Sequence, residues 1–255
     1  AMDCFEIMQN EGLTPNEVTF ICILKSCGNI GCIEQGEKIH KEILSRGLLK
    51  KDIVVGNALV TMYAKCGHIV EVEHVFSAMS HCNVVTWNAM LSVYVEQGQV
   101  EKTLNLYIQM LRGGIEPDQL TYMVGTQACS ILADTEEALL QEGQSIKVTS
   151  LKVGRALHSE ARRKGFLANE FLASALVSMY GKCGSLMEAE HVFNTMTHRD
   201  VVSWNTMLAC YVEQGKGQSA LHLYRCMQNE GVFPDQLTFM SAIQACTILA
   251  EVELL

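Results

Sequence analysis

Apolar residues recur along the chain at spacings of three and four residues, which is the pattern of amphipathic helices. Between residues 84 and 118 one such stripe comprises Trp87, Met90, Leu91 and Tyr94. A second stripe follows it and comprises Val100, Thr103, Leu104, Tyr107, Met110 and Leu111. Gly98 lies between them, at the kind of position where glycine ends a helix. The pattern predicts two amphipathic helices joined by a short turn.

This helix pair is repeated along the chain. Residues 84–118 and 201–235 share a VVTWN or VVSWN opening, an internal VEQG and a Gly-x-x-Pro-Asp ending, all in register. The three prolines of the chain all occupy a Gly-x-x-Pro ending, followed by Asp after Pro117 and Pro234 and by Asn after Pro15. Units of 35 residues lie in the length range of helical solenoids, in which each unit packs on its neighbours.

The same landmarks divide the whole chain into units of three alternating lengths. Units of 36, 31 and 35 residues follow one another, and the cycle then starts again. We predict a partial unit at 1–16 followed by units at 17–52, 53–83, 84–118, 119–169, 170–200 and 201–235, and a second partial unit at 236–255. Because the chain begins and stops inside a unit, we expect it to be part of a longer array.

Unit 119–169 departs from the cycle, since it has 51 residues. The excess lies near 134–149 and is polar, and Gly143 interrupts any helical run there. Insertions in repeat proteins emerge as loops on one face. We therefore predict a disordered surface loop between two helices, with a functional loop as the alternative.

Composition narrows the possible functions. The chain of 255 residues has 49% hydrophobic residues and a formal net charge of −9. Non-specific nucleic-acid binding needs clustered Lys and Arg, so an acidic chain argues against it, although side chains at chosen positions can still read individual bases. No apolar run reaches the length of about 18 residues that spans a membrane. The eleven cysteines contain no CxxC pair and are interpreted as reduced packing residues.

Three sets of residues together resemble the pentatricopeptide repeat family in its plant PLS subclass: the VVTWN-type openings, MYAKCG and MYGKCG in the short units, and the Gly-x-x-Pro-Asp endings. The resemblance covers essentially the whole chain. It makes 17–52, 119–169 and the partial 236–255 L-type repeats, 53–83 and 170–200 S-type repeats, and 84–118 and 201–235 P-type repeats. It implies an all-α fold, a right-handed superhelical solenoid of helix-turn-helix repeats that binds single-stranded RNA with one base per repeat.

In that family two side chains of each repeat choose the base: the residue that ends the VVTWN-type run and the last residue of the unit. The resemblance assigns these base-binding pairs: Asn57 with Asn83, Asn88 with Asp118, Ser174 with Asp200, and Asn205 with Asp235. The first resembles a cytidine-preferring pair, the third a guanosine-preferring pair, and the other two uridine-preferring pairs. The L-type units receive no base, because their apolar residues cannot form hydrogen bonds: Ile21, Met123 and Met240. The implied RNA core, from 5′ to 3′, is C, U, any base, G, U.

Four more residues lie three positions before the first member of each pair and resemble the family's apolar platforms that flank bases: Val54, Val85, Phe171 and Val202. An Asn amide both donates and accepts hydrogen bonds, and an ionised Asp accepts them, which suits the N3–H donor of uridine. The alternative interpretation is that these Asn residues satisfy backbone groups near a helix start.

His158-Ser159-Glu160 matches half of the zinc site of nucleoside deaminases. No CxxC follows it, and His158 corresponds to His40 of the earlier L-type unit, so repeat packing explains the match. We predict no metal, no cofactor and no catalysis in this chain. Lys65 and Lys182 follow the first helices of the S-type units and are candidates either for phosphate contacts or for interaction with a helix dipole.

The leading hypothesis is an array that binds single-stranded RNA selectively and serves as the specificity module for organellar RNA processing, above all cytidine-to-uridine editing. The resemblance implies a mitochondrial or chloroplast location and editing-complex proteins as partners, with any deaminase domain outside this chain. We predict neither a membrane nor a small molecule as partner. The rival is a protein-binding helical-repeat scaffold of the tetratricopeptide type, although its W-x-x-L-G-x-x-Y signature is absent.

Overall fold

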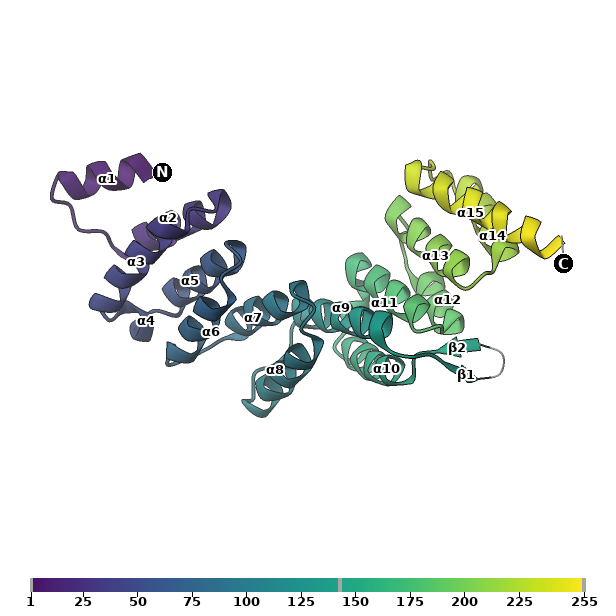
Figure 1. The fold of residues 1–255 in the computed structure, drawn as a ribbon, viewed down its shortest axis with the longest axis horizontal. Coiled ribbons are helices and arrows are strands. Elements are labelled where there is room, and N and C mark those ends of the chain that lie inside the picture. The colour runs from purple at the N-terminus through teal and green to yellow at the C-terminus, as the bar shows by residue number, and fades with distance from the viewer. Residues whose placement is uncertain (1, 142–143, 254–255) are drawn as a thin grey trace. The chain divides into compact units, whose positions relative to one another are not determined.

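The computed structural model describes residues 2–141 and 144–253, and helices dominate it (Figure 1). The helices of residues 1–118 are α1 Met2–Asn10, α2 Glu17–Ile30, α3 Ile33–Ser45, α4 Leu48–Lys51, α5 Ile53–Lys65, α6 Ile69–Ala78, α7 Val84–Glu96 and α8 Val100–Arg112. Those that follow are α9 Gln119–Thr135, α10 Val148–Arg163, the 3-10 helix η1 Phe166–Ala168, α11 Glu170–Lys182, α12 Leu186–Thr195, α13 Val201–Glu213, α14 Gly217–Asn229 and α15 Gln236–Glu253. Two strands, β1 Leu139–Gln141 and β2 Gln144–Ile146, lie between α9 and α10.

The helices are arranged as stacked pairs in each of two compact units, Ala1–Asp118 and Gln119–Leu255. In the first unit α2 packs on α5 and α5 on α7, while α3, α6 and α8 each pair with the helix that precedes them. In the second unit α9, α11, α13 and α15 stack in the same way, and α10, α12 and α14 pair with their predecessors. Each unit is therefore a helical-repeat stack, and the all-α fold is confirmed.

Local sequence explains where the helices begin and end. The residue before each of six first helices accepts a hydrogen bond from a backbone N–H of that helix's first turn: Asn16, Asp52, Asn83, Asn169, Asp200 and Asp235. Such caps satisfy N–H groups that have no partner within the helix. At the other end, Gly98 has φ +67°, as predicted for the turn between α7 and α8, and only glycine adopts this conformation without strain.

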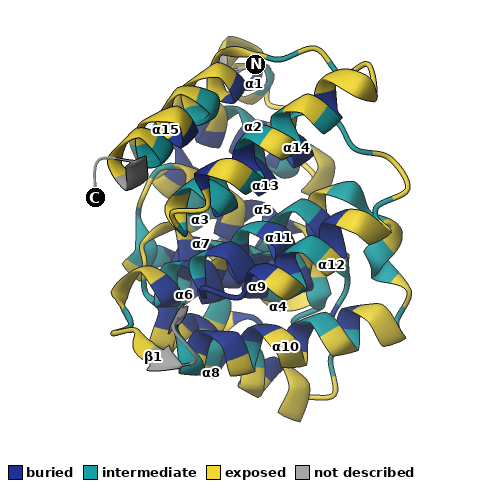
Figure 2. Cartoon of the chain, turned by 90° about the vertical axis from the view of Figure 1, so that its right-hand side faces the viewer, coloured by how far each residue is buried: buried dark blue, intermediate teal, exposed yellow. Residues whose placement is uncertain are grey.

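The core lies between the first helices and the second helices of each stack. Figure 2 shows α9 and α11 coloured mostly as buried, whereas α15 has many exposed residues. Two equivalent contacts repeat the same packing, since Trp87 meets Phe76 and Trp204 meets Phe193 edge to face, both with ring centroids 5.1 Å apart. The predicted stripes are correct at Met90 and Met110 but wrong at Leu111, whose side chain is 46% exposed.

The prediction of a disordered loop near 134–149 is wrong for the described part of that segment. Helix α9 continues to Thr135, and β1 and β2 form an antiparallel hairpin in which Leu139 pairs with Ile146; Gly143 lies outside the described residues. Hydrogen bonds hold the base of the hairpin. The Lys147 N–H donates to the Cys183 carbonyl at 3.0 Å, and Lys182 Nζ lies 2.6 Å from Asp134 Oδ2.

Glu136 attaches the hairpin to the start of α10. Its carboxylate accepts hydrogen bonds from the Thr149 and Ser150 N–H groups at 2.6 and 2.9 Å and from the Ser150 hydroxyl at 2.6 Å. Burial raises the pKa of Glu136, but these hydrogen bonds outweigh it and lower the pKa to about 2. A carboxylate at a helix N-terminus also interacts favourably with the helix dipole.

We predict that Glu136→Gln lowers the free energy of unfolding by about 1 kcal/mol at pH 7, the usual cost of a lost cap. Because the folded state lowers the pKa of Glu136, this stabilisation is complete above the ordinary range of the carboxyl pKa and is lost as the pH falls towards about 2. Urea unfolding of both proteins across that pH range measures the difference. Glu137→Gln, at an exposed neighbour, is the control and should change little.

Close contact between α14 and α15 requires a glycine. A Cβ atom on Gly217 would lie 2.6 Å from the backbone carbonyl oxygen of Ala245. We predict that Gly217→Ala lowers the free energy of unfolding by about 1–3 kcal/mol, the usual cost of overpacking. Gly113→Ala, whose Cβ would be 3.4 Å from its nearest neighbours, should be nearly neutral. Equal urea midpoints for the two variants would contradict the contact.

Candidate functional site

The structure brings three of the four predicted pairs into direct contact. The side-chain amide of Asn205 donates to Asp235 Oδ1 at 2.9 Å, and that of Asn88 donates to Asp118 Oδ1 at 2.8 Å. Asn57 makes the equivalent contact with Asn83 Oδ1 at 3.4 Å. The two members of each pair come from residues far apart in sequence, so the stacking of successive first helices places them side by side.

The fourth pair is linked indirectly. Ser174 is too short to reach Asp200, and its hydroxyl instead lies 3.1 Å from the Ser203 hydroxyl. Ser203 in turn donates to Asp200 Oδ1 at 2.8 Å. A serine bridge therefore replaces the direct contact, which leaves more space at this position than an Asn would.

Helix capping explains why the side chain of the last residue in a unit has a fixed orientation. Asn83, Asp200 and Asp235 each accept a hydrogen bond from the backbone N–H of the third residue in the next helix, at 3.1, 2.8 and 2.9 Å. The capping interpretation thus applies to these last residues. Asn57 and Asn205 lie inside α5 and α13 and take no part in capping.

The network also contains hydroxyl residues that were not predicted from the sequence. The Thr238 hydroxyl lies 2.6 Å from Asn205 Oδ1, and the Thr86 hydroxyl lies 2.6 Å from Asn57 Oδ1. Both belong to the capping motif Asn/Asp-x-x-Thr/Ser, in which the third helical residue returns a hydrogen bond to the cap. That motif is visible in the sequence and could have identified them.

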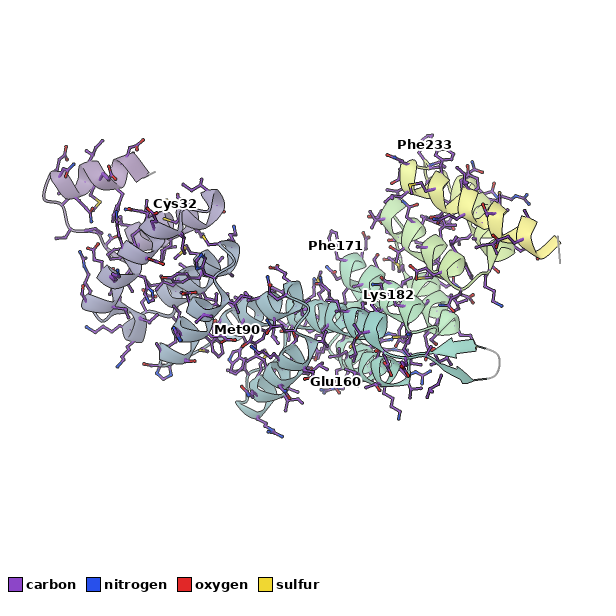
Figure 3. The ribbon with its side chains drawn as sticks, in the orientation of Figure 1. Cys32, Met90, Glu160, Phe171, Lys182 and Phe233 are labelled. Carbon is purple, nitrogen blue, oxygen red and sulfur yellow. The ribbon has the colours of Figure 1, made fainter. Side chains whose placement is uncertain are left out.

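The predicted apolar platforms are exposed, in contrast to most apolar side chains of the same helices. Val54, Val85 and Val202 project from the first turns of α5, α7 and α13. Phe171, labelled in Figure 3, lies near the start of α11 and is 73% exposed. No platform was predicted for the units that begin at residues 17, 119 and 236, yet the same position holds exposed apolar residues there as well: Val18, Leu120 and Leu237. Their position, second in the first helix, is the signal that would have found them.

A groove of about 410 Å³ lies between α13 and α15 and contains one complete pair. Asn205 and Asp235 line it together with the platform residue Val202 and its counterpart Leu237. A groove with one polar pair between two exposed apolar side chains can hold a planar ring and form hydrogen bonds to its edge. Asn88, by contrast, is buried at 2% exposure, so the pair at Asn205 is the more accessible one.

The groove is acidic. Hydrogen bonds from the Thr238 backbone and the Asn205 side chain lower the pKa of Asp235, which keeps that carboxyl ionised and an acceptor. The pKa of Asp200 is lowered in the same way by the Ser203 N–H. Glu213 also lines the groove, and burial raises its pKa. Neither lysine nor arginine is among the described residues that line it.

The other candidate residues have partners within the chain. Lys65 Nζ donates to Asn29 Oδ1 at 2.7 Å. Lys182, labelled in Figure 3, pairs with Asp134. Nδ1 of His158 lies 2.8 Å from the Tyr180 hydroxyl, and His40 makes the same contact with Tyr63 at 2.9 Å. Repeat packing accounts for His158. Within residues 2–141 and 144–253, His, Cys, Asp and Glu form no group of three that could hold a metal ion.

The stacked helix pairs and the repeated groove-lining residues define a helical-repeat protein. Models of the pentatricopeptide repeat match five segments, described as PPR repeat family at 82–129 and 199–247 and as PPR repeat at 18–48, 57–84 and 172–201. Together these segments cover more than half of the chain. The chain belongs to the pentatricopeptide repeat family.

Plant proteins of this family resemble the chain along almost its whole length. The chloroplastic pentatricopeptide repeat-containing protein At4g25270 of Arabidopsis thaliana is 35% identical over 99% of this chain and 44% of its own length. The chloroplastic protein At4g18520 of the same plant is 32% identical over 96% of this chain and 37% of its own length. The chain thus spans less than half of these curated relatives.

A solved structure agrees with the fold. The pentatricopeptide repeat protein PPR10, in complex with an 18-nt psaJ RNA element, superposes with a TM-score of 0.73 over 96% of this chain and 34% of that chain. The sequences are 18% identical, so this likeness concerns the fold. None of the described helices is both long enough and apolar enough to cross a membrane.

Proposed function

We propose that this chain binds single-stranded RNA and reads it with one base per repeat. The observation that carries the proposal is the groove at Asn205, where a hydrogen-bonding pair lies between exposed apolar side chains. An unstacked base fits such a site, because its faces can pack on apolar groups while its edge meets the polar pair. The complex of PPR10 with RNA supports the same use of this fold.

The side chains of Asn205 and Asp235 can offer a base one acceptor and one donor, which match the hydrogen-bonding groups of uridine. The hydrogen bonds from the Asn205 amide and the Thr238 N–H both reach Oδ1 of Asp235. Oδ2 can accept a hydrogen bond from the N3–H of uridine, and the second amide hydrogen of Asn205 can donate to a uridine carbonyl oxygen. Cytidine lacks the N3–H donor, so it loses one of these contacts.

In the PLS pattern the same site recurs in each repeat, and the type of the repeat determines which base it reads. L-type units at 17–52, 119–169 and 236–255 place apolar residues at the reading position and choose no base. S-type units at 53–83 and 170–200 read C and G, and P-type units at 84–118 and 201–235 read U. The RNA core is then C, U, any base, G, U.

The biological role that fits this arrangement is RNA processing in a plant organelle, as the specificity module for cytidine-to-uridine editing. The chloroplastic names of the relatives At4g25270 and At4g18520 support an organellar location. Editing-complex proteins would be the partners of the longer protein, and any deaminase would lie outside this chain.

We predict that the chain binds a short RNA containing CUNGU more tightly, by tenfold or more, than the RNA in which both U positions are A. A factor of ten corresponds to about 1.4 kcal/mol. Fluorescence anisotropy at two salt concentrations measures the two affinities, with the DNA version as a control. Because lysine and arginine are absent from the described groove lining, the salt dependence should be shallow. Equal affinity for both RNAs would reject base reading and favour a protein-binding scaffold.

Neutralising Glu213 should strengthen RNA binding. Its carboxylate lines the groove, where it repels a phosphate backbone at neutral pH. We predict that Glu213→Gln tightens binding about twofold, the effect of removing one unfavourable charge pair of roughly 0.5 kcal/mol. Since burial raises the pKa of Glu213, the wild-type protein should approach the affinity of the variant as the pH is lowered. An affinity ratio that stays constant with pH would contradict this.

A further inference from the structure

The third residue is buried in every first helix from α5 to α15. It contacts the core rather than the solvent in six successive helices, at Val55, Thr86, Thr121, Leu172, Ser203 and Thr238. A buried hydroxyl without a hydrogen-bonding partner is costly, whereas a buried valine or leucine is stabilising. Whether this position holds a hydroxyl or a hydrocarbon side chain therefore depends on whether a hydrogen-bonding partner lies next to it.

The residue type at this third position matches the residue type at the reading position of the preceding unit, which is the position that ends the VVTWN-type run. Where the preceding unit has Asn or Ser at its reading position, the next helix has a hydroxyl: Asn57 with Thr86, Asn88 with Thr121, Ser174 with Ser203, and Asn205 with Thr238. Where the preceding unit has an apolar residue, the next helix has one too: Ile21 with Val55, and Met123 with Leu172. All six junctions obey the rule.

The contacts at Asn205 explain the correspondence. The Thr238 N–H donates to Asp235 Oδ1 at 2.9 Å, which fixes an acceptor beside Asn205. Asn205 must then turn its Nδ2 towards that acceptor, at 2.9 Å, because two oxygens in contact would repel. Its Oδ1 thereby faces the Thr238 hydroxyl at 2.6 Å. Asn57, Asn83 and Thr86 form the same triangle.

We infer that the third-residue hydroxyl of the following helix is a specificity-determining positioning residue, which donates to the carbonyl oxygen of the reading Asn, turns that oxygen towards the next helix and leaves the N–H to face the base. This inference rests on the proposed reading of RNA. A donor at that place suits the O4 acceptor of uridine and opposes the N4 amino group of cytidine, which is itself a donor. The base choice of one repeat is thus completed by the next repeat.

The test compares binding of CUNGU and CUNGC RNA, in which only the base assigned to Asn205 differs. Wild-type protein should prefer uridine there about tenfold. Thr238→Val removes the hydroxyl at nearly constant volume, and with it one of the two hydrogen bonds that orient the Asn205 amide, so it should reduce the preference to less than about threefold. Thr238→Ser retains the hydroxyl and should restore it. Anisotropy titrations of the three proteins with both RNAs provide the ratios.

Thr19→Val is the matched control, because Thr19 makes the same capping contacts with Asn16 but bonds to no reading residue in the described part of the chain. It should keep the full uridine preference even if it lowers the melting temperature as much as Thr238→Val does. A preference retained by Thr238→Val would overturn the positioning role alone. Wild-type protein that does not distinguish the two RNAs would instead reject the assigned uridine reading at Asn205.

Discussion

The capping hydrogen bond at the start of each first helix is the interaction on which the rest of the site depends. A helix leaves N–H groups without partners in its first turn, and a preceding Asn or Asp supplies the acceptor. In this chain the capping residue is also the last residue of the preceding unit. The cap that begins helix α15 therefore fixes Asp235, and Asp235 orients Asn205.

Because one residue both caps a helix and belongs to a proposed reading pair, the geometry of each pair depends on how the helices stack. Asn205 lies in α13, whereas Asp235 and Thr238 lie at the start of α15, and the two helices pack side by side. Any change that moves one helix along the other separates the pair. For the proposed RNA ligand, specificity is accordingly a property of a junction between repeats, because each pair takes one residue from each of two stacked helices.

Charge plays a smaller part than geometry. The chain has a formal net charge of −9, and its groove at Asn205 is lined by carboxylates. Lys65 and Lys182, which the sequence offered for phosphate contacts, bond to Asn29 and Asp134 instead. For the proposed RNA ligand, such a surface favours discrimination by hydrogen bonds over attraction of any polyanion.

The helix pairs could be predicted from the amino-acid sequence alone, because the spacing of apolar residues and the Gly and Pro signals depend on local backbone chemistry. The resemblance of the sequence to the pentatricopeptide repeat family also assigned the pairs at Asn57, Asn88 and Asn205. Only the tertiary structure showed that Ser174 reaches Asp200 through Ser203, that Asn88 is buried, and that residues 139–146 contain a hairpin. Those features depend on distances between side chains of different helices and on hydrogen bonds at the base of the insertion, and no periodic pattern in one segment encodes them.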